Sequence, residues 1–191
     1  MENRWIKAVT MLPPTIKVCG SNLLTFCLRH RVALESINSP LLNPGTPITP
    51  RDLLFAVRIL STHDMKETRK AMTLKESFLL ALYTFSRKRF IAEVIKVGIY
   101  FEAQSLWPRF WEKDSKSHSG IPWHLAIIAG LMRGGCSLPE AWTMPESEAV
   151  WLYIAHCKAE GSKVEIVSDI EWEAMNKFKE EENKNTKNTR N

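Results

Sequence analysis

The sequence contains no apolar run long enough to cross a bilayer. Its longest apolar stretch covers residues 121–132, only 12 residues, and it includes His124, whereas a membrane-spanning helix needs about 20 consecutive apolar residues. Residues 1–14 also lack the apolar core of a secretory signal peptide. We therefore expect a protein that does not insert into membranes.

Cysteine is scarce, and its pattern matches no common metal or disulfide motif. The four cysteines form no C-x-x-C pair, which favours reduced thiols in a cytosolic setting. The best set of candidate metal ligands is His118, His124, Cys136 and Cys157. Their spacing is not that of a zinc finger or a zinc ribbon, and the adjacent His156 and Cys157 would point about 100° apart on a helix. The sequence therefore predicts no metal site and no cofactor.

Recognisable catalytic motifs are absent as well. The sequence contains no G-x-S-x-G, P-loop or G-x-G-x-x-G element. One catalytic arrangement would pair Cys136 as nucleophile with His124 as base, and the backbone N–H groups of Gly134 and Gly135 would then stabilise an oxyanion. The sequence shows no third residue that would activate this pair. The simpler interpretation is a small buried cysteine beside a helix end. We therefore expect a non-enzymatic protein with no catalytic residues.

Signals for helix starts recur along the chain. Capping boxes, in which Ser or Thr is followed three residues later by Glu, begin at Thr73, Ser137 and Ser168. Thr49 precedes Pro50, a residue type that suits the first position of a helix. Apolar residues follow these signals at helical spacing. The sequence therefore predicts an all-α fold, an irregular bundle of about six helices.

The predicted helices fall within one domain, which we place at residues 21–178. Residues 1–20 precede it as an extended segment that contains two consecutive prolines, with a short strand over 15–19 as its only regular element. Alternating polar and apolar residues predict at most another short strand near 163–167. Residues 179–191 contain no apolar side chain, and we expect them to form a disordered polar tail.

The net charge of +5 is unevenly distributed along the chain. Residues 1–138 carry 19 basic and 10 acidic side chains, whereas residues 139–182 carry 4 basic and 11 acidic ones. Opposite charges of this kind can attract within one chain or head to tail between copies. Scattered, solvated charges are the simpler interpretation, so the pattern leaves formation of a homo-oligomer open.

A basic cluster at Arg87, Lys88 and Arg89 is the main signal for nucleic-acid binding. Such a cluster neutralises phosphates with little sequence preference. Glu76 and Glu93 dilute the positive charge nearby, and the sequence contains no known recognition module. Binding of nucleic acid through these three basic residues is therefore the alternative function, not the leading one.

Large aromatic side chains are the remaining signal, since the chain contains seven tryptophans. Each taken singly is best read as a core residue, but a single domain rarely buries so many indoles completely. Tryptophan and tyrosine are also the residue types that anchor protein–protein interfaces. The candidate partner-binding residues are Trp107, Trp111, Trp142, Pro145, Trp151 and Tyr153.

Four segments carry a resemblance to a known group of proteins. They are L-P-P-T-I-K-V-C-G-S-N-L-L (Leu12–Leu24), I-N-S-P-L-L (Ile37–Leu42), T-P-R-D-L-L-F-A-V-R-I-L-S-T (Thr49–Thr62) and E-A-W-T-M-P-E-S-E-A-V-W-L-Y (Glu140–Tyr153). In these segments the chain resembles small helical tail-module proteins of tailed bacteriophages, which are often described as tail assembly chaperone-like.

The resemblance implies a function in tail assembly through protein–protein contacts. Its implied partner is the tape-measure protein or a tail subunit, and its implied location is the host cytoplasm or the virion. An apolar groove would cover a hydrophobic helix of the partner until another subunit displaces it. The family has no catalytic residues, so none are transferred to this chain.

Overall fold

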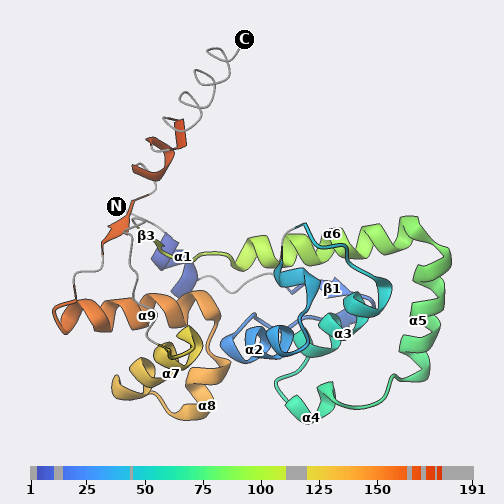
Figure 1. Ribbon diagram of the computed structural model, residues 1–191, viewed down its shortest axis with the longest axis horizontal. Coiled ribbons are helices and arrows are strands. Elements are labelled where there is room, and N and C mark those ends of the chain that lie inside the picture. The colour runs from blue at the N-terminus through green and yellow to red at the C-terminus, as the bar shows by residue number, and fades with distance from the viewer. Residues whose placement is uncertain are drawn as a thin grey trace.

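The computed structural model describes residues 4–10, 15–43, 45–110, 120–162, 165–168, 171–174 and 176–177. Within these ranges the chain is mainly helical, with short strands (Figure 1), and the all-α class is confirmed. The tail at residues 179–191, and Trp111 among the candidate binding residues, lie outside the described residues. Across the described ranges, no helix combines the length and the apolar character that a membrane span requires.

Ten helices occupy the described residues. They are α1 (Arg4–Thr10), α2 (Leu28–Ser36), the 3-10 helix η1 (Pro40–Leu42), α3 (Pro50–Leu60), α4 (Met65–Thr68), α5 (Leu74–Phe85), α6 (Arg87–Gln104), α7 (Trp123–Arg133), α8 (Leu138–Thr143) and α9 (Glu146–Ala159). The short strands form two antiparallel pairs. In the first, β1 (Lys17–Val18) pairs with β2 (Ser21–Asn22), and in the second, β3 (Arg109–Phe110) pairs with β4 (Ile166–Val167). The short strands expected over residues 15–19 and near 163–167 correspond to β1 and β4.

The N-terminal segment differs from the sequence-based expectation, because residues 4–10 form helix α1 and not an extended chain. The two prolines that suggested an extended path follow this helix and do not interrupt it. Helix α1 packs on α9 and buries Ala8. The described helices also outnumber the six that the sequence suggested, because α1, η1 and α4 are too short to show a clear apolar period.

The predicted helix starts at Thr49, Thr73 and Ser137 are confirmed as complete capping boxes. In each, the hydroxyl accepts the backbone N–H three residues later, and the carboxylate at that position accepts the backbone N–H of the capping residue. Because each box satisfies two backbone donors at a helix end, these three residues fix where α3, α5 and α8 begin.

Two hydrophobic clusters form the interior, and α2 contributes to both. The first cluster joins α2, α3, α5 and α6, and its fully buried side chains include Leu34, Leu53 and Leu60. The second joins α7, α8 and α9 around residues such as Ile128, and it includes Leu28 from the start of α2. In Figure 1, α2 lies between the group of α7, α8 and α9 and the group of α3 to α6. This arrangement leaves α5 and α6 at the outer edge of the molecule.

Candidate functional site

Helices α5 and α6 expose an unusual number of large apolar side chains. Leu74 is 92% exposed, Phe78 68% and Phe85 89%. Three isoleucines of α6 are each about half exposed and recur every fourth residue, so they follow one side of the helix. We call the following set the apolar face: Leu74, Phe78, Phe85, Ile91, Ile95 and Ile99.

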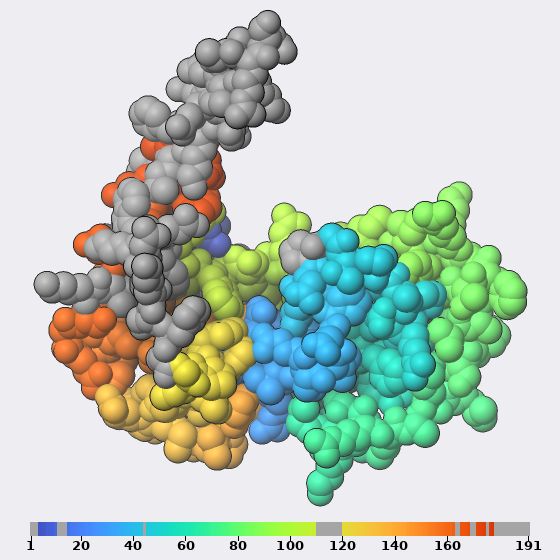
Figure 2. Space-filling model, in the orientation of Figure 1, coloured from blue at the N-terminus to red at the C-terminus, as the bar shows by residue number. Residues whose placement is uncertain are grey.

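The apolar face arises because both helices are apolar on two sides. Tyr83 on α5, and Val97 and Tyr100 on α6, are buried in the first hydrophobic cluster. The apolar face uses other positions of the same helices and is left outside that cluster. In the view of Figure 2, the green atoms of α5 form one end of the molecule, and no other segment covers them on that side. Large apolar side chains left exposed on two consecutive helices are candidates for an interaction site.

Positive charge borders the apolar face. Arg87, Lys88 and Arg89 are exposed at the start of α6, immediately after Phe85. Lys75 is exposed in the first turn of α5, next to Leu74. The three basic residues of the nucleic-acid alternative therefore lie beside the apolar face.

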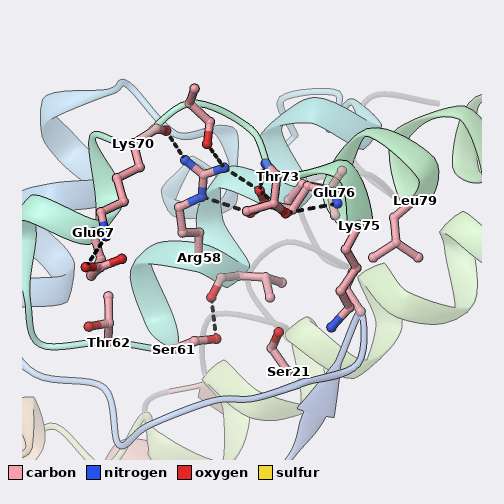
Figure 3. Close-up of a pocket in the computed structure, with 14 residues that line it drawn as sticks. Ser21, Arg58, Ser61, Thr62, Glu67, Lys70, Thr73, Lys75, Glu76 and Leu79 are labelled. Carbon is pink, nitrogen blue, oxygen red and sulfur yellow. Dashed lines mark hydrogen bonds and ion pairs between the residues drawn. The ribbon is translucent and has the colours of Figure 1, made fainter.

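An ion pair between Arg58 and Glu76 anchors the start of α5 to α3 (Figure 3). Arg58 Nε donates to Glu76 Oε1 at 2.8 Å, and Arg58 Nη2 donates to Oε2 at 2.5 Å. The same guanidinium donates to the backbone oxygen of Lys70, and Glu76 Oε2 also accepts the backbone N–H of Thr73 at 2.7 Å. One carboxylate thus closes the capping box of α5 and holds the helix against α3, which positions the apolar face.

This geometry predicts a defined pH dependence. The Arg58 guanidinium lowers the pKa of Glu76 from 4.5 to about 2. Because the folded-state pKa lies below the unfolded value, the contribution to stability is complete above pH 4.5 and disappears as the pH falls toward 2. We expect Glu76→Gln to lower the free energy of unfolding by about 1 kcal/mol at pH 7, a value reduced by solvent screening.

Urea unfolding of the wild type and Glu76→Gln at pH 7, 4 and 2.5 measures this contribution. The difference between the two proteins should shrink as the pH falls below 4.5, because Glu76 of the wild type then binds a proton in the unfolded state before it does so in the folded state. Other carboxylates titrate in both proteins and cancel in the comparison. A difference that stays constant from pH 7 to 2.5 would show that the charge of Glu76 does not stabilise the fold.

The structure places the candidate aromatic residues partly inside the chain. Trp107, Trp142 and Tyr153 are half-buried and pack against the second hydrophobic cluster. Trp151 is half-buried, and its indole N–H donates to the backbone oxygen of Leu106 at 2.8 Å. Pro145 is also half-buried, directly before α9. Their role in partner binding stays a prediction, while their contacts within the chain agree with the core role expected for each tryptophan taken singly.

A buried ion pair beneath these aromatic residues was not expected from the sequence. Glu146 lies in the first turn of α9, where a carboxylate is usually exposed, but its side chain is only 4% exposed. Arg31 Nε and Nη2 donate to its two carboxylate oxygens, the second at 3.0 Å, and Trp107 Nε1 donates to Oε2 at 3.1 Å. The pair joins α2 to the first turn of α9, across 115 residues of sequence.

The structure also brings together residues that can hold a metal, although the sequence predicted no metal site. They are not the candidate set weighed above, of which His124 has Nε2 3.1 Å from Glu35 Oε2. Among the described residues, one group of three potential ligands is close enough to share an ion, and it consists of Cys27, His30 and His63. Sequence reasoning missed this group, although the C-x-x-H spacing from Cys27 to His30 was a local signal for it.

No family model, curated protein or solved structure gives a match to this chain. The function therefore has to follow from the geometry of the described residues and from the sequence.

Proposed function

We propose that this is a non-enzymatic protein that binds a helix of a partner protein on the apolar face of α5 and α6. The observation that supports the proposal best is the near-complete exposure of Leu74 and Phe85, the first and last residues of α5. Following the resemblance described above, we propose that the partner is the tape-measure protein or a tail subunit of a tailed bacteriophage. Binding would take place in the host cytoplasm, before assembly of the virion.

The chemistry of the apolar face favours an amphipathic helix with acidic flanks as its occupant. Apolar side chains spaced by four residues on α6 form a ridge of the kind that packs against another helix. From typical side-chain areas, the six apolar residues expose roughly 600 Å², close to the 800 Å² that each partner buries in a standard interface. The exposed cations Arg87, Lys88 and Arg89 complement acidic residues beside the apolar stripe of the partner.

A second copy of this chain is a less suitable occupant. In a two-fold symmetric pair, the same surface patch of each copy meets the other. Both copies would then bring the three consecutive cations at the start of α6 to the same interface, and like charges oppose association. A partner whose flanks are acidic has no such penalty.

Release of the partner sets the expected affinity. A chaperone that covers a hydrophobic helix has to give it up to the next subunit, so the complex needs a moderate dissociation constant and a fast dissociation rate. The apolar face suits this requirement because it is an open surface on the outside of two helices. A partner can therefore leave without any rearrangement of the hydrophobic clusters.

Co-expression with a tape-measure protein of a tailed bacteriophage tests the proposal. We expect the two proteins to co-purify, and Phe78→Ser or Phe85→Ser to weaken the complex at least tenfold. Both side chains are largely exposed, so the variants should fold and melt like the wild type. Leu152→Ser is the matched control, because Leu152 is an exposed apolar residue on α9, outside the apolar face.

Three outcomes would contradict the proposal. Equal co-purification of the Phe78→Ser, Phe85→Ser and Leu152→Ser variants would show that the apolar face is not the binding surface. A dimer of the wild type that dissociates on Phe85→Ser would identify a second copy as the occupant. Salt-sensitive binding to DNA that Arg87→Glu abolishes and Phe85→Ser leaves intact would favour the nucleic-acid alternative.

A further inference from the structure

Cys27, His30 and His63 form a compact group of metal-binding side chains away from the apolar face. One potential ligand atom from each residue lies within 4.8 Å of those of the other two. Cys27 and His30 are completely buried, and His63 is half-buried. The two imidazole rings are 5.1 Å apart between centroids and tilted by 52°.

Two segments of backbone hold these three residues together. Cys27 is the residue that precedes the first turn of α2, and His30 lies within that turn. His63 follows α3 in the connection to α4, and Arg29 Nη1 donates to its backbone oxygen at 2.7 Å. Because α2 and α3 pack on one another, the positions of the three side chains are set by the hydrophobic cluster and not by the group itself.

The hydrogen bonds of His30 leave one ring nitrogen available to a ligand. Its Nε2 lies 3.0 Å from the backbone oxygen of Thr62, and this contact assigns the proton to Nε2. Its Nδ1 then carries a lone pair. A backbone carbonyl that fixes the far nitrogen of the ring is the usual support for a metal-bound histidine.

Two buried ring nitrogens of the group lack hydrogen-bond partners. Within the described part of the chain, His30 Nδ1 and His63 Nε2 are both inaccessible to solvent and unpaired. Buried polar atoms in proteins are nearly always hydrogen-bonded, so each exception requires an explanation. A ligand shared by the two nitrogens explains both at once.

We propose that Cys27, His30 and His63 bind a zinc ion through Sγ, Nδ1 and Nε2, respectively. One thiolate and two imidazoles are typical zinc ligands, and this mixture of sulfur and nitrogen does not suit magnesium or calcium. In a tetrahedral zinc site the ligand atoms are roughly 3.3–3.6 Å apart, so the group has to contract by about 1 Å on binding. On binding, the thiol of Cys27 loses its proton to solvent, and both imidazoles stay neutral.

Three protein ligands leave one coordination position for water. His63 also lines a surface hollow with Met65 and Trp142, and this hollow gives the ion a route from solvent. The nearby guanidinium of Arg29 opposes the charge of the ion, so the site should bind less tightly than a site with four protein ligands. The bound ion would join the start of α2 to the connection between α3 and α4, which is a structural role.

Zinc titration of the full-length, chelator-treated protein tests the proposal. We expect one Zn²⁺ per chain, bound with a dissociation constant of about 1 µM or lower, and a melting temperature roughly 5–10 °C higher at a hundredfold excess over that constant. Substitution with Co²⁺ should give the visible spectrum of a tetrahedral ion and a near-ultraviolet band from one thiolate. Cys27→Ser and His63→Gln should each weaken binding at least a hundredfold.

The double variant Cys136→Ser/His156→Gln is the control, because it removes one cysteine and one histidine outside the group and should bind zinc like the wild type. Absence of zinc binding by the wild type, or equal affinity in His63→Gln, would overturn the proposal. So would an octahedral cobalt spectrum without a thiolate band. The half-buried position of His63 makes a folding defect in His63→Gln small, and the cobalt spectrum of the wild type needs no variant.

Discussion

Replacing Glu146 by alanine is expected to lower the free energy of unfolding by about 3–5 kcal/mol. The carboxylate is almost completely buried and accepts two hydrogen bonds from Arg31 and one from Trp107. Alanine removes the acceptor but leaves the guanidinium of Arg31, which is 22% exposed, without its counter-charge. A buried charge that loses its partner destabilises a fold more than the intact pair stabilises it.

The surroundings of Arg31 make this loss difficult to compensate. Its guanidinium lies 5.3 Å from the ring centroids of Phe26 and Trp107 and 5.6 Å from that of Trp123. These rings attract the cation but offer no hydrogen-bond acceptor in place of the carboxylate. Arg31 has to turn toward solvent in the variant, and the aromatic packing around it then loosens.

A double-mutant cycle measured by urea unfolding separates the pair from its surroundings. Arg31→Met/Glu146→Leu replaces the pair by apolar side chains of similar size, so it should be more stable than Glu146→Leu or Arg31→Met alone. Additive effects of the two single replacements would show that the side chains do not interact in the folded protein.

The parts of the fold that depend on neighbouring residues could be predicted from the sequence. The capping boxes at Thr49, Thr73 and Ser137 involve residues only three positions apart, so their chemistry is complete within a short segment. The short strand near residues 163–167 was also evident from local alternation. Helix α1 was missed because the prolines after it dominated the interpretation of the whole N-terminal segment.

The candidate sites depend on contacts that no local pattern specifies. The pairing of Arg31 with Glu146 spans 115 residues, and His63 lies 33 residues beyond His30, the last position of the C-x-x-H motif at Cys27. The apolar face is difficult to predict from the sequence for a different reason. Periodicity shows that α5 and α6 are apolar, but which side stays uncovered depends on how the other helices pack.

The aromatic residues illustrate the same limit. A tryptophan in the sequence indicates a large contact area but not what it contacts. In the structure, the indole N–H groups of Trp107 and Trp151 donate to Glu146 and to the backbone oxygen of Leu106, both within the chain. By contrast, Phe78 and Phe85, which no sequence pattern singled out, are more exposed than any tryptophan of the described residues.

Gly130→Ala is expected to destabilise the protein by about 2 kcal/mol, although alanine is the better helix former. Gly130 lies in α7, where α9 packs against it. A Cβ atom at this position would lie 2.5 Å from Cδ2 and 2.8 Å from Cε2 of Tyr153. The ring would have to move away, and part of the packing between α7 and α9 would be lost. This loss exceeds the gain in stability of about 1 kcal/mol from the higher helix propensity of alanine.

Gly98→Ala is the matched control, because it makes the same replacement within α6, where a Cβ atom would meet no other atom within 4 Å. There only helix propensity acts, so stability should rise by about 0.5–1 kcal/mol. In a protein of this size the melting temperature should therefore fall by roughly 4–8 °C for Gly130→Ala and rise by roughly 1–4 °C for Gly98→Ala. A rise for both variants would mean that the ring of Tyr153 yields freely, and Tyr153 would then be a residue available to a partner and not one committed to the contact between α7 and α9.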